Sequence, residues 1–199
     1  MSTFIVGLTG GLASGKSTAL DFFGKLGIDI FSADKVVHYL MANNGLAYSA
    51  IVAHFGENII NLEKSIDRNK LRTLIFNSPE EKRWLEHYLH PLVRASLLEQ
   101  CKKSTSPYVV VEIPLLAESQ TPFEWINRVL VVDAEEETQQ LRAQNRSGLS
   151  PTESQPILNQ QASRQKRNNL ADDIVTNHGS LSELELQIKT LHKKYLKLN

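Results

Sequence analysis

Apolar runs of strand length alternate with segments of helical spacing along much of this chain. The runs lie at residues 4–9, 28–31, 107–113 and 128–133, and a more polar segment at residues 170–177 predicts a last short strand. Continuous apolar runs are typical of parallel strands that are buried on both faces, and helical spacing follows the first of them. The pattern predicts an α/β fold built on a parallel sheet.

Residues 38–104 interrupt this alternation. Apolar residues recur there at helical spacing, in groups that include Ile51, Leu71 and Leu85, with little strand signal between them. This stretch predicts a helical lobe inserted between the second and third strands.

Two features are expected to break the helices of this lobe. The first is a turn at residues 65–68, and the second is the pair His90 and Pro91, because proline disfavours a helical conformation in the residue before it. His87 and His90 are three residues apart and could face one metal ion, but no third ligand at a sensible spacing follows. We therefore favour ordinary surface histidines.

The turn after the first strand carries a complete phosphate-binding pattern, G-x-x-x-x-G-K-[ST]. Glycine lets the backbone approach a polyphosphate, the N–H groups of the loop and the start of the following helix attract anions, and a lysine adds a positive charge. A serine or threonine after the lysine can hold Mg²⁺, which makes Ser17 the expected metal ligand. The expected nucleotide-binding residues are Gly10, Gly11, Leu12, Ala13, Ser14, Gly15, Lys16, Ser17 and Thr18.

Two carboxylates are expected at the same edge of the sheet as this loop. Asp34 follows the second strand and Glu112 closes the third, and ligands of doubly wound sheets bind at the carboxyl ends of the strands. Asp34 is a catalytic candidate, although Asp34 or Ser32 could equally cap the next helix. Glu112 could orient water or support a metal, or it could be an edge carboxylate without such a role.

A polar, basic segment extends from Arg142 to Arg167. The segment contains five arginine and lysine residues but only one acidic residue, Glu153. It is interrupted by Gly148, Pro151 and Pro156. We interpret it as a helical hairpin or flap that projects from the core and closes over bound nucleotide. A solvated basic face is the alternative.

The overall composition limits the partners of the protein. The 199 residues contain 22 basic and 22 acidic side chains, so net charge gives no reason to expect nucleic acid or an anionic membrane. Cys101 is the single cysteine, which excludes an intrachain disulfide and a multi-cysteine metal site. No apolar run approaches the length of about 20 residues that spans a bilayer. We expect a cytoplasmic protein that is a monomer or a weak homo-oligomer.

The ordered set of motifs resembles the dephospho-coenzyme A kinases, which belong to the nucleoside-monophosphate-kinase-like group of phosphate-loop enzymes. The resemblance runs nearly from end to end and is more specific than the loop alone. It is carried by Gly7 to Gly11 with Ser14 to Thr18, Ala33-Asp34, Asp67-Arg68 with Leu71, Leu89-His90-Pro91, Pro114-Leu115-Leu116 with Glu118, Arg142 and Arg146, Gln161 with Arg164, and Ala171-Asp172 with Asn177.

The resemblance implies a three-layer phosphate-loop NTPase fold with a five-stranded parallel sheet. It implies a nucleotide-binding core at residues 1–34, 105–145 and 169–199, a helical acceptor domain at 35–104 and a lid at 146–168. The implied reaction transfers the γ-phosphoryl group of ATP, with Mg²⁺, to the 3'-hydroxyl of dephospho-coenzyme A, which is the last step of coenzyme A biosynthesis.

The resemblance also implies roles for individual residues. Asp34 would accept the hydroxyl proton, and Lys16, Arg142 and Arg146 would act on the phosphates. The residues implied to bind the acceptor substrate are Asp34, Arg68, His90, Pro114, Leu115, Glu118, Gln161 and Arg164.

Four positions depart from the usual pattern of that family. Ser32 replaces a common aspartate, which leaves Asp34 as the sole carboxylate of its turn, and Glu112 stands where aspartate or an apolar residue is frequent. Leu12-Ala13 replaces a common isoleucine-glycine pair, a modest change if the backbone there avoids positive φ.

Three other functions remain open on the residues alone. The loop and flap do not specify the acceptor, so a kinase for another small hydroxyl compound is possible. A GTPase switch would need a guanine-reading N-K-x-D motif and a D-x-x-G switch after the second strand region, and the sequence has no N-K-x-D motif and no D-x-x-G motif in that region. The basic flap argues against a bare ATP-binding module.

Overall fold

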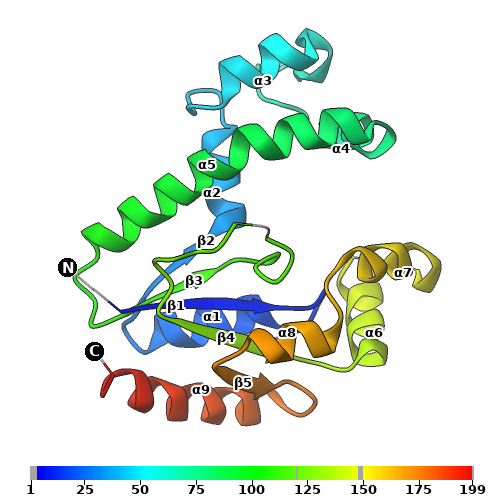
Figure 1. Ribbon diagram of the computed structural model, residues 1–199. Helices are drawn as coiled ribbons and strands as arrows, with labels where there is room; N and C mark the ends of the chain where they lie inside the picture. The colour runs from blue at the N-terminus through cyan, green and yellow to red at the C-terminus, as the bar shows by residue number, and fades with distance from the viewer. Residues whose placement is uncertain (1–3, 120, 148–149, 199) are drawn as a thin grey trace. The chain divides into compact units, whose positions relative to one another are not determined.

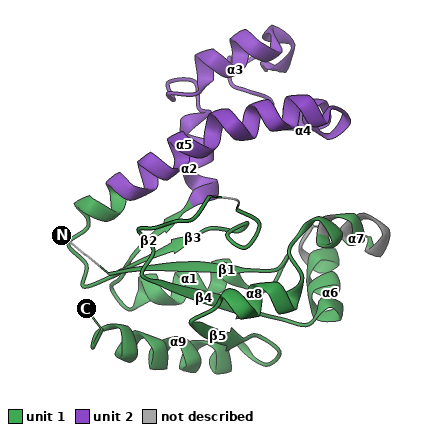
Figure 2. Cartoon of the chain, viewed as in Figure 1, with its two compact units in different colours: residues 1–32, 100–199 green, residues 33–99 purple. Residues whose placement is uncertain are grey.

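The computed structural model describes residues 4–119, 121–147 and 150–198. The chain divides into two compact units (Figure 2). Unit 1 comprises residues 1–32 and 100–199, and unit 2 comprises residues 33–99. The insertion that the sequence predicted after the second strand is thus a compact unit of its own.

Unit 1 is built on one five-stranded parallel sheet, as expected for the predicted fold class (Figure 1). The strand order is β2-β3-β1-β4-β5, with β1 in the centre. All four pairings are parallel. The strands are β1 (Ile5–Gly10), β2 (Asp29–Ser32), β3 (Val109–Glu112), β4 (Arg128–Asp133) and β5 (Asp173–Thr176). Because the strands are parallel, the turns after β1, β3 and β4 emerge at one edge of the sheet.

Among the described residues, five helices belong entirely to unit 1. They are α1 (Lys16–Lys25), α6 (Glu136–Ser147), α7 (Pro151–Gln160), α8 (Arg164–Leu170) and α9 (Leu181–Tyr195). Helices α1 and α9 pack beside each other, and α8 packs against β4. A capping box begins α9, in which Ser180 and Glu183 bond reciprocally.

The main core of unit 1 lies between the sheet and the pair α1 and α9. Three aromatic side chains fill its centre: Phe23 stacks on Tyr195 at 6.2 Å between ring centroids and meets Tyr108 edge-on at 6.3 Å. Each of the three has 0% of its surface exposed. Aromatic burial of this kind fixes α1 on the sheet, and α1 begins at the phosphate loop.

The segment 142–167 differs in part from the predicted projecting flap. Helices α6 and α7 do form a connected pair, in which Gln140 Nε2 donates to Gln155 Oε1 at 2.7 Å. The end of the segment, however, belongs to α8, which packs on β4, and Arg167 is only 6% exposed. The prediction that this end is unpacked was wrong. Tertiary packing buries a basic residue that local polarity assigned to solvent.

Unit 2 is helical. It contains α2 (Ala33–Leu40), α3 (Tyr48–Phe55), a 3₁₀ turn η1 (Glu57–Ile59), α4 (Arg68–Asn77) and most of α5 (Pro79–Lys103). Asp67 caps α4 by accepting the N–H groups of Asn69 and Lys70. The turn predicted at residues 65–68 is therefore the entry to α4.

The prediction that His90-Pro91 ends a helix was wrong. Helix α5 runs through Pro91 for 25 residues. Proline removes one hydrogen bond to the preceding turn. The helix persists because buried apolar side chains recur every four residues on both sides of Pro91, at Leu85, Leu89, Val93 and Leu97.

Candidate active site

The phosphate loop connects the central strand β1 to α1 at the carboxyl edge of the sheet. Its last glycine, Gly15, has φ 100° and is the N-cap of α1. This left-handed conformation favours glycine, and a Cβ atom on Gly15 would also lie 2.1 Å from Asn177 Nδ2. Glycine is therefore required at this position both for the backbone turn and for the close approach of a neighbouring side chain.

The mouth of the loop carries the side chain of Lys16. Its ammonium donates to the carbonyl oxygens of Gly10 and Gly11, at 3.0 and 2.7 Å. Lys16 is the first residue of α1, and Ser17 next to it is exposed. A positive charge and the N–H end of a helix thus meet at one place, an arrangement that attracts an anion.

The replacement of the family's isoleucine-glycine pair by Leu12-Ala13 is less modest than predicted. Ala13 has φ 49°, in the left-handed region that L residues avoid. The change from glycine to alanine would be modest only if the backbone at residue 13 had no positive φ, and it has one. The loop accordingly holds an alanine in a strained backbone conformation.

Side chains from distant elements hold the outer side of the loop. Asn177 Nδ2, after β5, donates to the Ser14 carbonyl at 2.7 Å, and Gln161 Oε1, after α7, accepts the Leu12 N–H at 3.0 Å. Thr9 at the end of β1 donates to the carbonyl of Pro114 at 3.2 Å. The loop is therefore a preorganised part of unit 1.

Other predicted residues lie around this edge of unit 1. Pro114 and the exposed Leu115 follow β3, and Glu118 Oε1 accepts the N–H of Ala162 at 2.6 Å, next to Gln161. The structure thus brings Pro114, Glu118 and Gln161 into the surroundings of the phosphate loop.

The predicted arginines differ in their surroundings. Arg164 makes a two-pronged ion pair with Asp133 at the end of β4, at 2.8 and 2.7 Å, and these hydrogen bonds hold the pKa of Asp133 below its ordinary value. Arg142 is partly buried on α6, and its Nη1 atom has no hydrogen-bond partner among the residues described. Arg146 lies in α6, but its side chain is outside what the structure describes.

Glu112 closes β3 and is 7% exposed. It pairs in register with Leu8 of β1 on one side and with Ser32 of β2 on the other. Its carboxylate is therefore central in the sheet, at the edge that carries the phosphate loop.

Three predicted residues belong to unit 2. Asp34 is exposed in the first turn of α2, two residues after β2 ends, and makes no hydrogen bond or ion pair with the described residues of its own unit. Arg68, the first residue of α4, has Nη1 3.2 Å from His38 Nδ1 of α2. His90 is exposed on α5. No side-chain cap from Asp34 or Ser32 to α2 is observed among the described residues.

Sequence reasoning missed two residues at the loop, Gln139 and Arg167. A Cβ atom on Gly11 would lie 2.3 Å from Gln139 Oε1 and 2.9 Å from Arg167 Nη2. Both residues lie in a polar stretch whose periodicity gives no sign of burial. The spacing of Arg164 and Arg167, which lie one helical turn apart, was the only available signal.

A model of a protein family described as dephospho-CoA kinase matches residues 4–183. The chain belongs to the dephospho-CoA kinase family. It is 41% identical to a dephospho-CoA kinase of Coxiella burnetii, over 97% of each chain. It is 42% identical to one of Photobacterium profundum, over 99% of this chain and 98% of the relative. Members of this family are ATP-dependent kinases that catalyse the final step of coenzyme A biosynthesis, so the protein is a phosphotransferase.

Solved structures agree with this assignment. A protein from Thermus thermophilus superposes with a TM-score of 0.81 at 28% identity, over 98% of both chains. The dephospho-CoA kinase from Campylobacter jejuni gives a TM-score of 0.70 at 30% identity, over 99% of this chain and 98% of that one. The likeness to shikimate kinase from Acinetobacter baumannii, with a TM-score of 0.55 at 16% identity, shows only the shared phosphate-loop fold.

Kinases of this kind generally need a divalent metal ion. Within the part of the chain that the structure describes, no group of three or more His, Cys, Asp or Glu side chains could hold one. Mg²⁺ in kinases keeps several waters and binds substrate phosphates together with one or two protein ligands. The exposed Ser17 hydroxyl and the Glu112 carboxylate supply oxygen, the donor that Mg²⁺ prefers.

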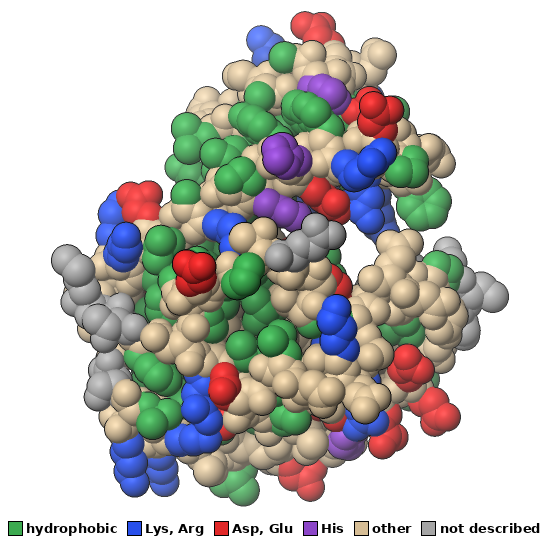
Figure 3. Space-filling model, in the orientation of Figure 1, with side chains coloured by type: hydrophobic (Ala, Val, Ile, Leu, Met, Phe, Trp, Pro, Cys, Tyr) green, Lys and Arg blue, Asp and Glu red, His purple; other side chains and the backbone are tan. Residues whose placement is uncertain are grey.

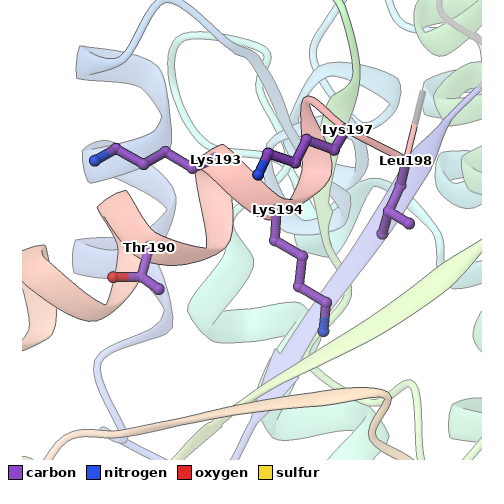
Figure 4. Close-up of a pocket in the computed structure, with 5 residues that line it drawn as sticks. All are labelled: Thr190, Lys193, Lys194, Lys197 and Leu198. Atoms are coloured by element: carbon purple, nitrogen blue, oxygen red, sulfur yellow. The ribbon is translucent and has the colours of Figure 1, made fainter.

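A depression of about 510 Å³ lies far from this kinase's phosphate loop, at the C-terminal end of α9 (Figure 4). It is lined by Thr190, Lys193, Lys194, Lys197 and Leu198. Basic side chains gather over this end of the helix in Figure 3, but the lysines in Figure 4 point in different directions. Basic residues complement the negative end of a helix, which accounts for their position.

No described helix of this kinase is long and apolar enough to cross a membrane.

Proposed function

We propose that this protein binds ATP at the loop Gly10–Thr18 and transfers the γ-phosphoryl group to the 3'-hydroxyl of dephospho-coenzyme A. The observation that carries the proposal is the preorganised phosphate loop, with Lys16 at its mouth, in a chain of the dephospho-CoA kinase family. Residues 1–34, 105–145 and 169–199 would form the nucleotide-binding core, 35–104 the acceptor domain and 146–168 the lid. The ATP supply of the cytoplasm makes it the proposed location.

The phosphates would be held by backbone N–H groups and by Lys16. An incoming polyphosphate offers stronger acceptors than the two loop carbonyls that Lys16 contacts now, so the ammonium is expected to turn toward it. Mg²⁺, held by Ser17 with Glu112 in support, would neutralise charge on the phosphates. Arg142 and Arg146 would add positive charge from α6, and the unpartnered Nη1 atom of Arg142 is consistent with such a role.

Asp34 is the proposed general base. Its carboxylate is exposed and makes no hydrogen bond or ion pair within unit 2, so it is available to receive the proton of the acceptor hydroxyl. Arg68, His90, Pro114, Leu115, Glu118, Gln161 and Arg164 are the proposed acceptor-site residues. Gln161 is bonded to the loop, Arg164 to Asp133 of β4 and Glu118 to the N–H of Ala162, so these residues would act by shaping the site as much as by direct contact.

The central experiment is incubation of the protein with ATP, Mg²⁺ and dephospho-coenzyme A, followed by mass analysis. The expected products are ADP and a species heavier by one phosphoryl group. A panel of other hydroxyl acceptors, and GTP in place of ATP, tests the competing kinase and GTPase functions. Transfer to another acceptor alone, or slow hydrolysis of GTP alone, would replace the proposal.

The role of Asp34 is tested by Asp34→Asn. Turnover should fall by about 10²- to 10⁴-fold, the usual contribution of general acid–base catalysis, while ATP affinity stays within about twofold of wild type. Asp21→Asn, which changes an exposed carboxylate on α1, is the matched control and should leave turnover unchanged. Near-normal turnover of Asp34→Asn would exclude Asp34 as the base.

A further inference from the structure

Two buried polar side chains press against the second residue of the phosphate loop. Gln139 of α6 is 1% exposed and Arg167 of α8 is 6% exposed. The space that a Cβ atom of Gly11 would occupy is taken by Gln139 Oε1, at 2.3 Å, and by Arg167 Nη2, at 2.9 Å. Gly11 has no positive φ. Glycine is thus required here by these two side chains, and not by the backbone conformation.

Neither side chain is fully satisfied. Gln139 Nε2 donates to the carbonyl of Ala134 at 2.7 Å, but its buried Oε1 atom has no hydrogen-bond partner among the residues described. Arg167 donates through Nη1 to the carbonyl of Ala162. Within the described residues no carboxylate lies within salt-bridge distance of the guanidinium, which carries five N–H donors.

The charge on Arg167 is therefore unfavourable in the free protein. Burial lowers the pKa of Arg167, and the more distant carboxylates of Glu118, Asp133 and Glu136 only partly oppose this effect. A buried charge without a close partner costs free energy, and an opposite charge placed nearby recovers it. Perturbed pKa values of this kind cluster at functional sites, where a ligand can supply the counter-charge.

The segment that carries Arg167 is fixed to the loop at a second point. Gln161 accepts the N–H of Leu12, and Ala162, the acceptor of Arg167, donates its own N–H to Glu118. Residues 161–167 thus contact the loop at both Gly11 and Leu12. Arg167 is held against the loop by a rigid connection.

We propose that Arg167 is a positioning residue for the nucleotide: wedged with Gln139 against Gly11, its buried guanidinium fixes the first turn of the phosphate loop, and its charge is balanced when a polyphosphate fills the loop. This inference rests on the proposed function only in that the loop binds ATP. The outcomes that decide it are measured by ADP binding without any acceptor, so it can fail while phosphoryl transfer succeeds, and the reverse.

The first test is Arg167→Met, measured by calorimetric titration with ADP and by thermal unfolding without ligand. ADP affinity should fall at least about tenfold, the effect of losing an interaction with a charged group, while the Tm of the free protein stays equal or rises. The KM for ATP should rise and that for dephospho-coenzyme A should not. Arg167→Lys keeps the charge but loses the planar guanidinium, and its ADP affinity should lie between those of Arg167→Met and wild type.

Lys166→Met is the matched control, because Lys166 is the exposed neighbour on the same helix. It removes the same charge and should leave ADP affinity near that of wild type. A lower Tm for Arg167→Met together with wild-type ADP affinity would show a purely structural role and overturn the proposal. Equal losses of ADP affinity in Arg167→Met and Lys166→Met would also overturn it.

A second test does not depend on Arg167→Met folding. Gly11→Ala should weaken ADP binding because the new methyl group collides with Gln139 Oε1. Adding Gln139→Ala removes that atom and should restore part of the ADP affinity. If the double variant binds ADP no better than Gly11→Ala alone, the wedge does not exist and the proposal is wrong.

Discussion

The side chain of Asn177, directly after β5, forms a hydrogen bond to the phosphate loop. Its removal tests the idea that the loop is preorganised. Nδ2 donates to the Ser14 carbonyl at 2.7 Å, and Asn177 is 6% exposed. It also occupies the space left by the missing Cβ of Gly15. Asn177→Ala would leave a buried carbonyl without its donor and an empty volume beneath the start of α1.

The expected loss of stability follows from these contacts. A buried acceptor left unsatisfied costs about 1–3 kcal/mol. An unfolding entropy of about 2.1 cal/mol/K per residue gives about 0.42 kcal/mol/K for the 199 residues of the chain. The Tm should therefore fall by about 2–7 °C. Because the released carbonyl belongs to the loop, the KM for ATP should rise as well, while the KM for dephospho-coenzyme A should change little.

Gln187→Ala is the matched control. Gln187 of α9 accepts the N–H of Thr176 and donates to the Thr176 carbonyl, both at 2.9 Å. Thr176 is the neighbour of Asn177, but these two hydrogen bonds do not involve the phosphate loop. Thermal unfolding and steady-state kinetics on both variants separate the two effects. If Asn177→Ala loses stability but keeps the wild-type KM for ATP, as Gln187→Ala should, the hydrogen bond supports the fold and does not position the loop.

Two further predictions concern stability. Burial opposes the ionisation of Asp173, but hydrogen bonds from Arg128, Lys194 and Tyr195 outweigh it and hold its pKa below the ordinary value. This stabilisation should be complete above about pH 4 and be lost as the pH falls through the lower, folded-state pKa. Asp173→Asn should lower the free energy of unfolding at pH 7 by about 3 kcal/mol. It should also make the free energy of unfolding fall less steeply as the pH is lowered, which urea titrations at several pH values would show. The same acid dependence as in wild type would contradict this. Pro91→Ala should raise the free energy of unfolding because it restores a missing hydrogen bond in α5. The gain should be smaller than the cost of a proline inside a helix, which is about 3 kcal/mol. A lower Tm for this variant would show that the proline is required there.

The sequence by itself determined the sheet, the phosphate loop and the helical insertion. Each of these depends on short-range order: an apolar run for a buried strand, glycines and a lysine at fixed spacing for the loop, and apolar residues at helical spacing for the insertion. The strand at residues 128–133 matches β4 residue for residue. The family followed from the order of the motifs along the chain, and this order is likewise visible in the sequence alone.

Only the tertiary structure decided where α5 ends and which side chains surround the loop. Helix α5 continues through Pro91 because a buried stripe of leucine and valine outweighs one lost hydrogen bond. Arg167 and Gln139 are polar in the sequence but buried in the fold, since their burial depends on partners that are more than a hundred residues away, at Gly11. Local spacing cannot report such contacts. The residues proposed to bind the nucleotide can thus be predicted from the sequence, whereas the side chains that pack against the loop become known only when distant segments come together in the fold.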